Sequence, residues 1–418
     1  MKSGESARLR VILSTFGPLH LIKSAECLSP LVDIRVIQGW LPAWWNRWLL
    51  TLASRLVGRD LYKSFRKRTP ACLSGHNRGL GLAEFYLWAC KLFKLQSPLK
   101  SSVKAAHIYG RQSRHYIRRA DVFHVRSGSG LSGALETARK RGMKVVVDHS
   151  IAHPAFMDRQ LRGEYAKYGV TFDLGMDNPF WSEIVEECGK ADVVLVNSQF
   201  VKDTFVAEGF PADKIAVVLL GVRSDFFSLK KAYALRDGVL RILFTGGFGF
   251  RKGAEYVLQA LKELERRGIA YSMTVVGDYR GALPLVERFK PQSLRLVSTV
   301  PQDELKGYLA ESDVYLFPSL CEGCASSGME ALAAGLPVVA TPESGLPIED
   351  GENGLIVPSK QVTPIVDALE RIAGDEALRS KLGKAAARTI AENYTWECYA
   401  ERVAALYKTL TGRRYVVA

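Results

Sequence analysis

The sequence predicts an α/β protein of two domains, each built on an open, doubly wound parallel sheet. Its 418 residues exceed what one ordinary hydrophobic core holds, so two domains of roughly 200 residues each are expected. Short apolar segments rich in β-branched residues alternate with segments of helical period, which is typical of parallel strands joined by helical crossovers. The pattern weakens between Gly221 and Gly238, and we place the domain boundary there.

The first domain, residues 1–221, enters a strand almost at once. Its expected strands span residues 8–14, 32–38, 121–126, 143–149, 192–197 and 215–220. Between residues 40 and 119 the strand rhythm gives way to helical, basic sequence. This segment is therefore expected to form an insertion or a large helical edge of the first domain.

The second domain, residues 222–390, shows a cleaner alternation. Its expected strands span residues 241–245, 272–277, 294–299, 313–318 and 337–341, and its expected helices lie near 253–268, 282–289, 303–310 and 327–334. Each strand is short and apolar, as in a parallel sheet whose two faces are covered by helices. Helical signals then continue from Thr363 to Leu410, with a break near Tyr394.

The net charge of +14 is concentrated in the helical segment of the first domain. Residues 40–119 hold sixteen Lys or Arg side chains against two acids, Asp60 and Glu84. The same segment also holds the aromatic residues Trp40, Trp44, Trp45, Trp48, Phe65, Phe85, Tyr86, Trp88 and Phe93. Such a segment suits an anionic membrane surface; nucleic acid and a plain solvated face are the alternatives. We favour the membrane surface and expect no nucleic acid partner.

Cysteine usage and hydropathy indicate the compartment. We expect no signal peptide, and no stretch reaches the ~18 uncharged apolar residues that a membrane span needs. Seven cysteines, mostly scattered, fit a reducing compartment, so we expect a cytoplasmic protein on the inner face of the membrane. Cys321 and Cys324 have the spacing of a redox or zinc pair, but no second pair or nearby histidine accompanies them. We interpret them as small loop residues and expect no metal site.

The most informative motif sets Glu322 and Glu330 on either side of a small-residue loop that opens into a helix. A buried strand precedes the loop, and such a strand–loop–helix junction aims free backbone N–H groups and a positive helix end at one point. The two carboxylates flanking that point suit the hydroxyls of a sugar and of a ribose. The alternative is structural: Ser327 caps the helix and Glu330 completes a capping box.

A second phosphate-binding candidate lies between a strand and a helix, in the glycine-rich run from Phe244 to Gly253. Its glycines permit close backbone approach, and Arg251 or Lys252 can neutralise a diphosphate. No Gly-Lys-Ser/Thr follows, so it is not a Walker loop.

A competing interpretation comes from the first domain. A strand leads into Gly128-Ser-Gly130-Leu-Ser-Gly133, a helix follows, and Asp148 ends the next strand. This spacing matches a dinucleotide fingerprint and favours an NAD-dependent oxidoreductase. The unit is not the first βαβ of its domain, which weighs against that interpretation.

His149 and His153 follow the strand that carries Asp148. Ligands bind at the carboxyl ends of strands in open parallel sheets. Pro154 argues against an uninterrupted helix that would bring both rings to one metal. We therefore expect a hydrogen bond to substrate from these histidines and no zinc site.

Taken together, these motifs resemble the retaining GT-B glycosyltransferases of family 4. The matching runs are Asp192 to Ser198, Gly221-Val222, Lys252-Gly253, Pro301 with Glu304-Leu305, Asp313 to Ser319, Glu322 to Glu330, and Gly351 to Pro358. The first 120 residues match poorly beyond the opening strand and Gly17. The resemblance implies two Rossmann-like domains facing a cleft, with residues 391–418 forming a helix that crosses back to the first domain.

The resemblance also implies roles for individual residues. Glu322 would hold hydroxyls of the donor sugar, Glu330 the ribose, and His149 the transferred sugar. The implied catalytic residues are Glu322, His149 and Lys252, and the implied donor-binding residues are Gly17, Gly247, Arg251, Lys252, Gly323, Cys324, Ala325, Ser326, Ser327 and Glu330. The family usually has an arginine where this chain has Gly247, so we expect Arg251 to supply the missing cation.

We therefore expect a retaining hexosyltransferase that needs no cofactor or metal and moves a sugar from a UDP- or GDP-sugar to a lipid-linked or cell-envelope glycan, as in polysaccharide or lipopolysaccharide biosynthesis. The alternatives are the NAD-dependent oxidoreductase and a catalytically silent protein that binds sugar nucleotides.

Overall fold

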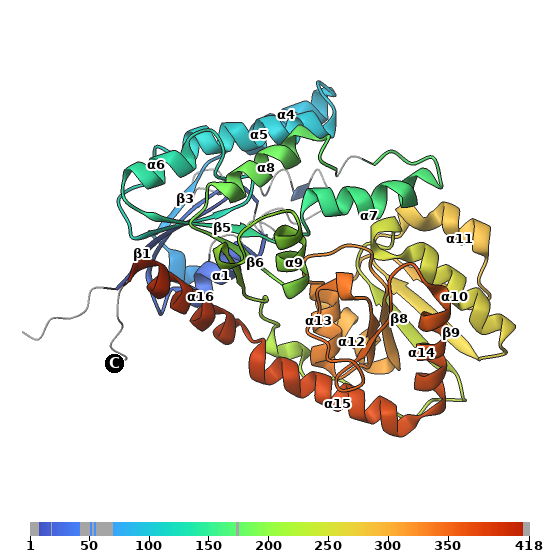
Figure 1. The fold of residues 1–418 in the computed structure, drawn as a ribbon. Coiled ribbons are helices and arrows are strands. Elements are labelled where there is room, and N and C mark those ends of the chain that lie inside the picture. Colours follow the sequence, from blue (N-terminus) through green and yellow to red (C-terminus); the bar gives the residue numbers. More distant parts are fainter. Residues whose placement is uncertain are drawn as a thin grey trace, which may run out of the picture.

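The computed structural model describes residues 8–17, 19–41, 51, 54–55, 70–172 and 175–412. It contains two parallel sheets (Figure 1), a seven-stranded sheet in the order β3-β2-β1-β4-β5-β6-β7 and a six-stranded sheet in the order β10-β9-β8-β11-β12-β13. The predicted fold class, two doubly wound Rossmann-like domains, is confirmed. Of the basic segment 40–119, residues 42–50, 52–53 and 56–69 lie outside the described residues.

The first sheet contains all six strands predicted for this half, because each is an apolar run buried on both faces. Its strands are β1 Arg10–Thr15, β2 Asp33–Gln38, β3 Asn77–Gly79, β4 Val122–Arg126, β5 Lys144–His149, β6 Val193–Val196 and β7 Ile215–Val217. Its helices are α1 Leu19–Leu28, α4 Leu82–Phe93, α5 Pro98–Ser113, α6 Ala134–Lys140, α7 Pro154–Ala166, α8 Pro179–Gly189 and α9 Gln199–Ala207. The sequence pattern missed β3, because it is a polar three-residue edge strand.

The second sheet follows the predicted alternation closely. Its strands are β8 Leu240–Thr245, β9 Tyr271–Val276, β10 Leu294–Val297, β11 Val314–Phe317, β12 Val338–Ala340 and β13 Leu355–Ile356. Its helices are α10 Ala254–Arg266, α11 Leu283–Phe289, α12 Gln302–Glu311, α13 Ser326–Ala334, α14 Val362–Gly374 and α15 Glu376–Asn393. The pattern missed β13, which is only two residues long.

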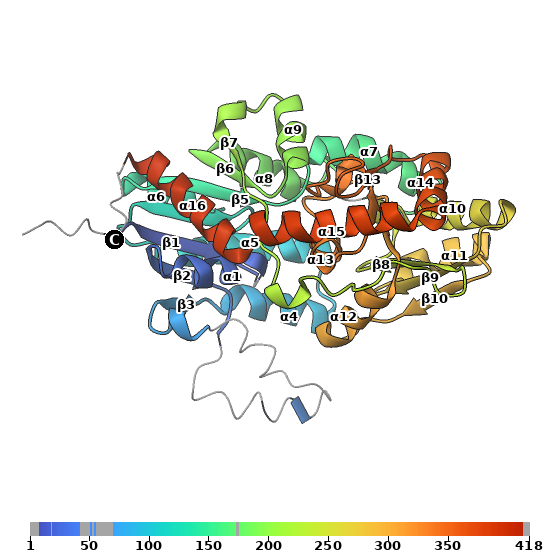
Figure 2. The same ribbon diagram turned by 90° about the horizontal axis from the view of Figure 1, so that it is seen from below.

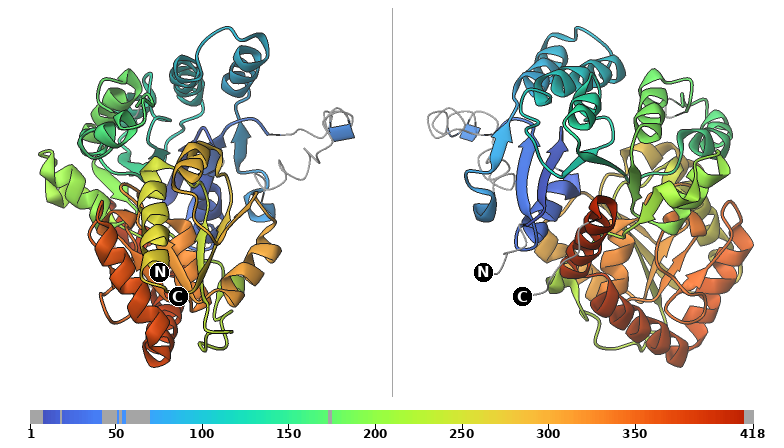
Figure 3. Two further views of the ribbon diagram at one scale, coloured as in Figure 1. Left: turned by 90° about the vertical axis from the view of Figure 1, so that its right-hand side faces the viewer. Right: turned by 60° about the vertical axis from the view of Figure 1, so that its left-hand side comes forward.

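The last described helix, α16 (Trp396–Thr411), lies on the first domain although α15 packs against α13 of the second (Figures 1 and 2). Tyr399, Val403 and Tyr407 are buried in one apolar cluster with residues of β1, β2 and α1. Thr395 caps the helix by accepting a hydrogen bond from the Cys398 N–H at 3.2 Å. The chain therefore crosses between the domains twice, at residue 222 and again at residue 395, and these two residues form a β-bridge. Figure 3 shows α16 beside the first sheet from another side.

The glycine-rich loop at residues 128–133 is closed by a carboxylate of its own domain. Glu187 on α8 is buried and accepts hydrogen bonds from the backbone N–H groups of Gly128 and, at 2.7 Å, of Gly130. Burial raises the pKa of Glu187 to about 7, although the two N–H donors act in the opposite direction. Asp148 is buried as well and pairs with Arg126 and His20. The loop amides and the acid that a dinucleotide needs are thus already bonded, and the NAD interpretation finds no support.

The packing of this loop predicts that Gly130→Ala destabilises the protein. A Cβ at this position would lie 1.9 Å from Leu135 Cδ1 and 2.4 Å from Glu187 Oε1, and relieving such overlap in a packed core costs about 1–3 kcal/mol. Gly189→Ala on α8, where nothing lies within 4 Å of the added Cβ, is the control and should change stability by less than about 1 kcal/mol. Denaturant unfolding of both variants measures the difference. Equal stabilities would show that the Glu187 loop is not tightly packed.

Candidate active site

Two loops of the second domain form one wall of the candidate site and are bonded to each other. The first joins β8 to α10 through the short 3-10 helix Phe250–Lys252, and the second joins β11 to α13. Arg251 connects them, because its backbone oxygen accepts from the Leu320 N–H at 2.9 Å and its Nη1 donates to the Cys321 carbonyl at 2.7 Å. Gly253 has φ +75°, and a Cβ there would lie 2.0 Å from the Pro318 carbonyl. Only glycine permits this close approach.

The Glu322 carboxylate lies between two cations at the junction of these loops. Its Oε1 is 2.7 Å from Arg251 Nη1 and 3.5 Å from Lys252 Nζ, and its side chain is 13% exposed. The Lys252 ammonium also lies 5.2 Å from the centre of the Phe317 ring. The Glu322 N–H donates to the Glu343 carbonyl at 2.9 Å, which fixes the backbone below the carboxylate. Glu322, Arg251 and Lys252 thus form one compact group.

The helix α13 begins one residue earlier than predicted, and the capping interpretation is wrong. Ala325 occupies the N-cap position and supplies no side-chain hydrogen bond. Ser327 lies inside the first turn, where its Oγ accepts from the Tyr315 hydroxyl at 2.8 Å. Glu330 follows in the second turn and is half-buried. An uncapped helix start leaves first-turn N–H groups available to an anion.

The surroundings of Glu330 change the pKa of its carboxyl. Burial raises the pKa of its carboxyl to about 7, Arg223 opposes that rise, and Asp225 adds to it. Arg223 is itself held by Asp225 through hydrogen bonds of 3.0 and 2.6 Å. A carboxylate of this kind gains from any ligand that donates hydrogen bonds to it.

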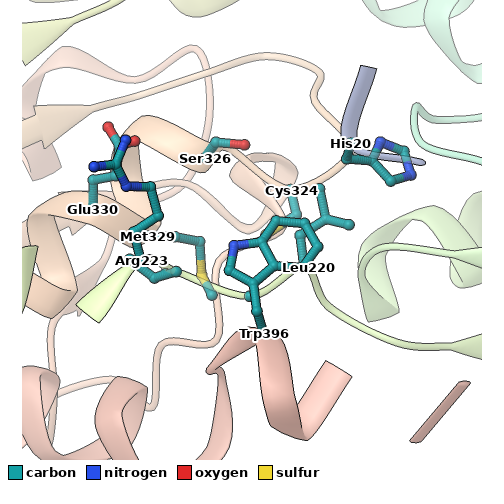
Figure 4. A pocket seen from close by; sticks show the side chains of 10 residues that line it. His20, Leu220, Arg223, Cys324, Ser326, Met329, Glu330 and Trp396 are labelled. Atoms are coloured by element: carbon teal, nitrogen blue, oxygen red, sulfur yellow. The ribbon is translucent and has the colours of Figure 1, made fainter. Parts of the chain in front are cut away.

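A cavity of about 200 Å³ lies where both domains and the crossing helix meet (Figure 4). Its lining residues are His20, Leu220, Gly221, Val222, Arg223, Cys324, Ser326, Met329, Glu330 and Trp396. Figure 4 shows Glu330 and His20 at opposite ends of this lining. The sequence motifs identified Cys324, Ser326 and Glu330, but missed His20, Arg223 and Trp396. In the first domain, His20 could have been identified from its position, three residues after Gly17 and at the start of a helix.

His149 ends β5 and is buried in the first domain. Its Nδ1 lies 3.1 Å from Ser127 Oγ, whereas its Nε2 has no hydrogen-bond partner within the described part of the chain. Burial, with a contribution from Arg126, lowers the pKa of His149 to about 3, so the ring is neutral. The next residue, Ser150, touches the Glu322 loop: a Cβ at Gly323 would lie 2.1 Å from the Ser150 carbonyl. The structure therefore brings the end of β5 against this loop.

The remaining predicted residues are placed as follows. The His153 Nδ1 accepts from the Ala155 N–H at 3.2 Å and caps α7, so this nitrogen has a structural role, and the expected substrate contact stays a prediction. Gly17 precedes α1, and its carbonyl accepts from Thr15 Oγ1 at 2.6 Å. Gly247 is exposed, and nothing lies within 4 Å of a Cβ built there.

Neither a metal cluster nor a membrane span is found in the described residues. None of their His, Cys, Asp and Glu side chains gather in groups of three that could hold a metal ion. Cys321 and Cys324 are buried thiols whose pKa is raised to about 12 by burial. Among the described helices, none is both long and apolar enough to cross a membrane.

Comparison with known proteins agrees with this geometry. The family model described as Glycosyltransferase Family 4 matches residues 83–226, and the model described as Glycosyl transferases group 1 matches residues 240–375. The amylovoran biosynthesis glycosyltransferase AmsK of Erwinia amylovora is 32% identical over 198 residues, which is 44% of this chain and 48% of AmsK. The chain spans about half the length of the curated relatives that it matches.

Two solved structures share the fold at low identity. Sucrose-phosphate synthase from Thermosynechococcus elongatus is 16% identical with a TM-score of 0.65, covering 97% of this chain and all of that one. Anabaena HepE in complex with UDP is 14% identical with a TM-score of 0.61, covering 96% of this chain and all of that one. The two family models together match more than half of the chain. The chain belongs to the family 4 glycosyltransferases of GT-B fold.

Proposed function

We propose that this protein transfers a sugar, with retention of configuration, from a UDP- or GDP-sugar to a lipid-linked or cell-envelope glycan. The observation that carries the proposal is the group formed by Glu322, Arg251 and Lys252 beside the uncapped start of α13. Glu330 lines the cavity that this helix start also lines. The relative AmsK is named for amylovoran biosynthesis, and HepE was solved with UDP; both support a nucleotide-sugar donor and a polysaccharide product.

In this proposal the second domain binds the donor in three parts. Glu330 accepts hydrogen bonds from the ribose hydroxyls, the first-turn amides of α13 and Lys252 bind the diphosphate, and Glu322 binds the donor sugar. Lys252 and Arg251 form ion pairs with Glu322. A bound diphosphate then shares Lys252 with Glu322, so the carboxylate stays oriented while the cation gains a second anion.

The proposed reaction is a front-face displacement. The bond between the anomeric carbon and the diphosphate oxygen breaks, and the acceptor oxygen bonds to the same face of that carbon. The bond electrons leave with the nucleoside diphosphate, which also takes the proton of the acceptor hydroxyl. Lys252, Arg251 and the helix end stabilise the charge that develops on the leaving group. Because these groups supply the positive charge, we expect turnover without added divalent metal.

Arg251 is proposed to replace the cation absent at Gly247. Its guanidinium donates a hydrogen bond to the Cys321 carbonyl and forms an ion pair with Glu322, so it is held at the junction of the two loops. In this proposal a cation four residues later in the loop serves the same diphosphate.

We also propose that the first domain rests on the cytoplasmic face of an anionic membrane through α4. One face of this helix exposes Leu82, Phe85, Trp88 and Leu92, each more than half exposed, and Lys91 and Lys94 lie beside them. A neighbouring groove on α5 has mainly apolar walls and also includes Lys100, Lys104 and Arg111. Exposed aromatic residues next to cations favour insertion at an anionic lipid interface.

The Trp40 N–H donates a hydrogen bond to Glu84 of α4 at 2.9 Å. This bond places the start of α4 at the carboxyl end of β2, on the acceptor side.

A thermal-shift screen against UDP-, GDP-, ADP- and dTDP-sugars tests the donor class. We expect one UDP- or GDP-sugar to raise the melting temperature, because ligand binding stabilises only the folded state.

Turnover of that donor should depend on the charged group at the loop junction. Glu322→Gln should lower turnover about 100-fold or more, and Arg251→Ala should lower it sharply. The control Glu287→Gln, at an exposed position on α11, should leave turnover unchanged. Donor binding without turnover in the wild type would instead identify a silent sugar-nucleotide-binding protein.

Donor affinity should depend on pH through Glu330. Its pKa of about 7 in the free protein means that below pH 7 the carboxyl must lose its proton before it accepts from the ribose. Raising the pH from 6 to 8 should therefore increase this residue's contribution to affinity about tenfold. The contribution is the difference between wild type and Glu330→Gln, measured by calorimetry with a nucleotide sugar, so that pH effects common to both proteins cancel. Parallel pH profiles for the two proteins would refute the role.

Membrane binding should depend on the exposed face of α4. Phe85→Ser with Trp88→Ser should reduce co-sedimentation with anionic vesicles about tenfold, because the apolar contact is removed, and salt should weaken binding of the wild type. Val170→Ser with Leu283→Ser removes two exposed apolar side chains elsewhere and should bind as the wild type does. Indifference of the wild type to lipid charge would overturn the proposal.

A further inference from the structure

We infer, on the basis of the proposed function, that His20 is a ligand of the donor diphosphate and that the buried carboxylate Asp148 positions it. His20 lies in the first turn of α1, and its side chain is 12% exposed. It contributes to the same cavity as Cys324 and Ser326, which lie at the start of α13 in the other domain. The first domain thus contributes an imidazole to a cavity that the start of α13 lines from the second domain.

The orientation of the His20 ring is fixed from behind. Its Nε2 lies 3.1 and 3.0 Å from the two carboxylate oxygens of Asp148. Burial alone would raise the pKa of Asp148, but His20, His124 and Arg126 together hold it well below its usual range. An ionised carboxylate only accepts hydrogen bonds, so the His20 Nε2 carries a proton. The other nitrogen, Nδ1, has no hydrogen-bond partner among the described residues and remains for a ligand.

Asp148 is in turn held rigidly. Arg126 Nη1 donates to its Oδ1 and to its backbone carbonyl, both at 2.9 Å. His124, fully buried, lies 3.6 Å from its Oδ2 and is hydrogen-bonded through Nδ1 to the Tyr407 hydroxyl of α16. Tyr407 of the crossing helix therefore orients the His124 ring, whose Nε2 lies near Asp148 but has no hydrogen-bond partner in the described part of the chain. Asp148 in turn bonds His20. A carboxylate behind a histidine fixes both the tautomer and the orientation of its ring.

The ligand at Nδ1 is identified by the opposite side of the cavity. The start of α13 offers uncapped amides, which favour an anion. A phosphate oxygen at Nδ1 requires a donor there, so in this assignment the ring donates from Nε2 to Asp148 and from Nδ1 to the diphosphate. This assignment gives Asp148 a use that the dinucleotide interpretation could not supply. It also explains the placement of a histidine in the first turn of α1.

The test separates the phosphate contact from a purely structural role. Calorimetry measures binding of the nucleoside diphosphate that the wild type prefers, and ligand-observed NMR measures binding of the matching nucleoside without phosphates. His20→Gln should lose about 10- to 100-fold in affinity for the diphosphate, as expected for a charge-assisted hydrogen bond, and change nucleoside affinity less than about twofold. Asp148→Asn should show the same selective loss, and the double variant should lose no more than either single one.

Two variants of α16 guard against misfolding of Asp148→Asn. Tyr407→Phe removes the hydroxyl that bonds His124, whereas Tyr399→Phe removes a hydroxyl that bonds Ser24 in the same interface at 3.2 Å. Only the first should weaken diphosphate binding. Unchanged diphosphate affinity in folded His20→Gln, or equal losses for diphosphate and nucleoside, would overturn the assignment. A wild type that binds no nucleoside diphosphate would overturn the proposed function, and this inference with it.

Discussion

The interaction on which the candidate site depends is the ion pair between Arg251 and Glu322, which joins the loops after β8 and β11. Glu322 is largely buried, and an unpaired carboxylate at such a place costs several kcal/mol or takes up a proton. Arg251 and Lys252 offset that cost and hold the carboxylate in one orientation. The two strands are neighbours in a parallel sheet, so their carboxyl ends bring the loops together. The sheet topology and the ion pair therefore fix the arrangement of the candidate site.

The buried carboxylates of this protein are stabilised in different ways, and the differences indicate their uses. Glu187 accepts from backbone N–H groups, Asp148 is surrounded by cations and histidines, and Asp313 pairs with Arg241 and Lys230. Each of these three is bonded to groups within the protein. Glu330 differs, because burial raises its pKa to about 7 and Arg223 only partly opposes that rise. A carboxyl that the protein leaves unstabilised in a cavity is the one that a hydroxyl-bearing ligand can stabilise.

The sequence was sufficient for the parts of the fold and site that depend on local pattern. Buried strands such as β8 and β11 are continuous apolar runs, and the Glu322 loop lies within one strand–loop–helix unit. The predictions that failed concern features that depend on contacts between distant parts of the chain. The glycine-rich loop at 128–133 matches a dinucleotide motif, but its amides are satisfied by Glu187, almost sixty residues later in the chain. His20 and Trp396 line one cavity although they are separated by most of the chain, and no periodicity connects them.

The crossing helix α16 shows why the two domains of this fold are not independent. Tyr399, Val403 and Tyr407 fill the apolar cluster of β1, β2 and α1, so the core of the first domain is complete only when the end of the chain returns to it. The same helix starts with Trp396 in the cavity wall and carries the hydroxyl that bonds His124. Apolar burial holds α16 in place without directional constraint, whereas the hydrogen bonds of Tyr407 with His124 and of Tyr399 with Ser24 specify one register of the helix on the sheet. The geometry of a site between the two domains thus depends on α16. This helix packs on the first domain, but the chain enters it from the second domain.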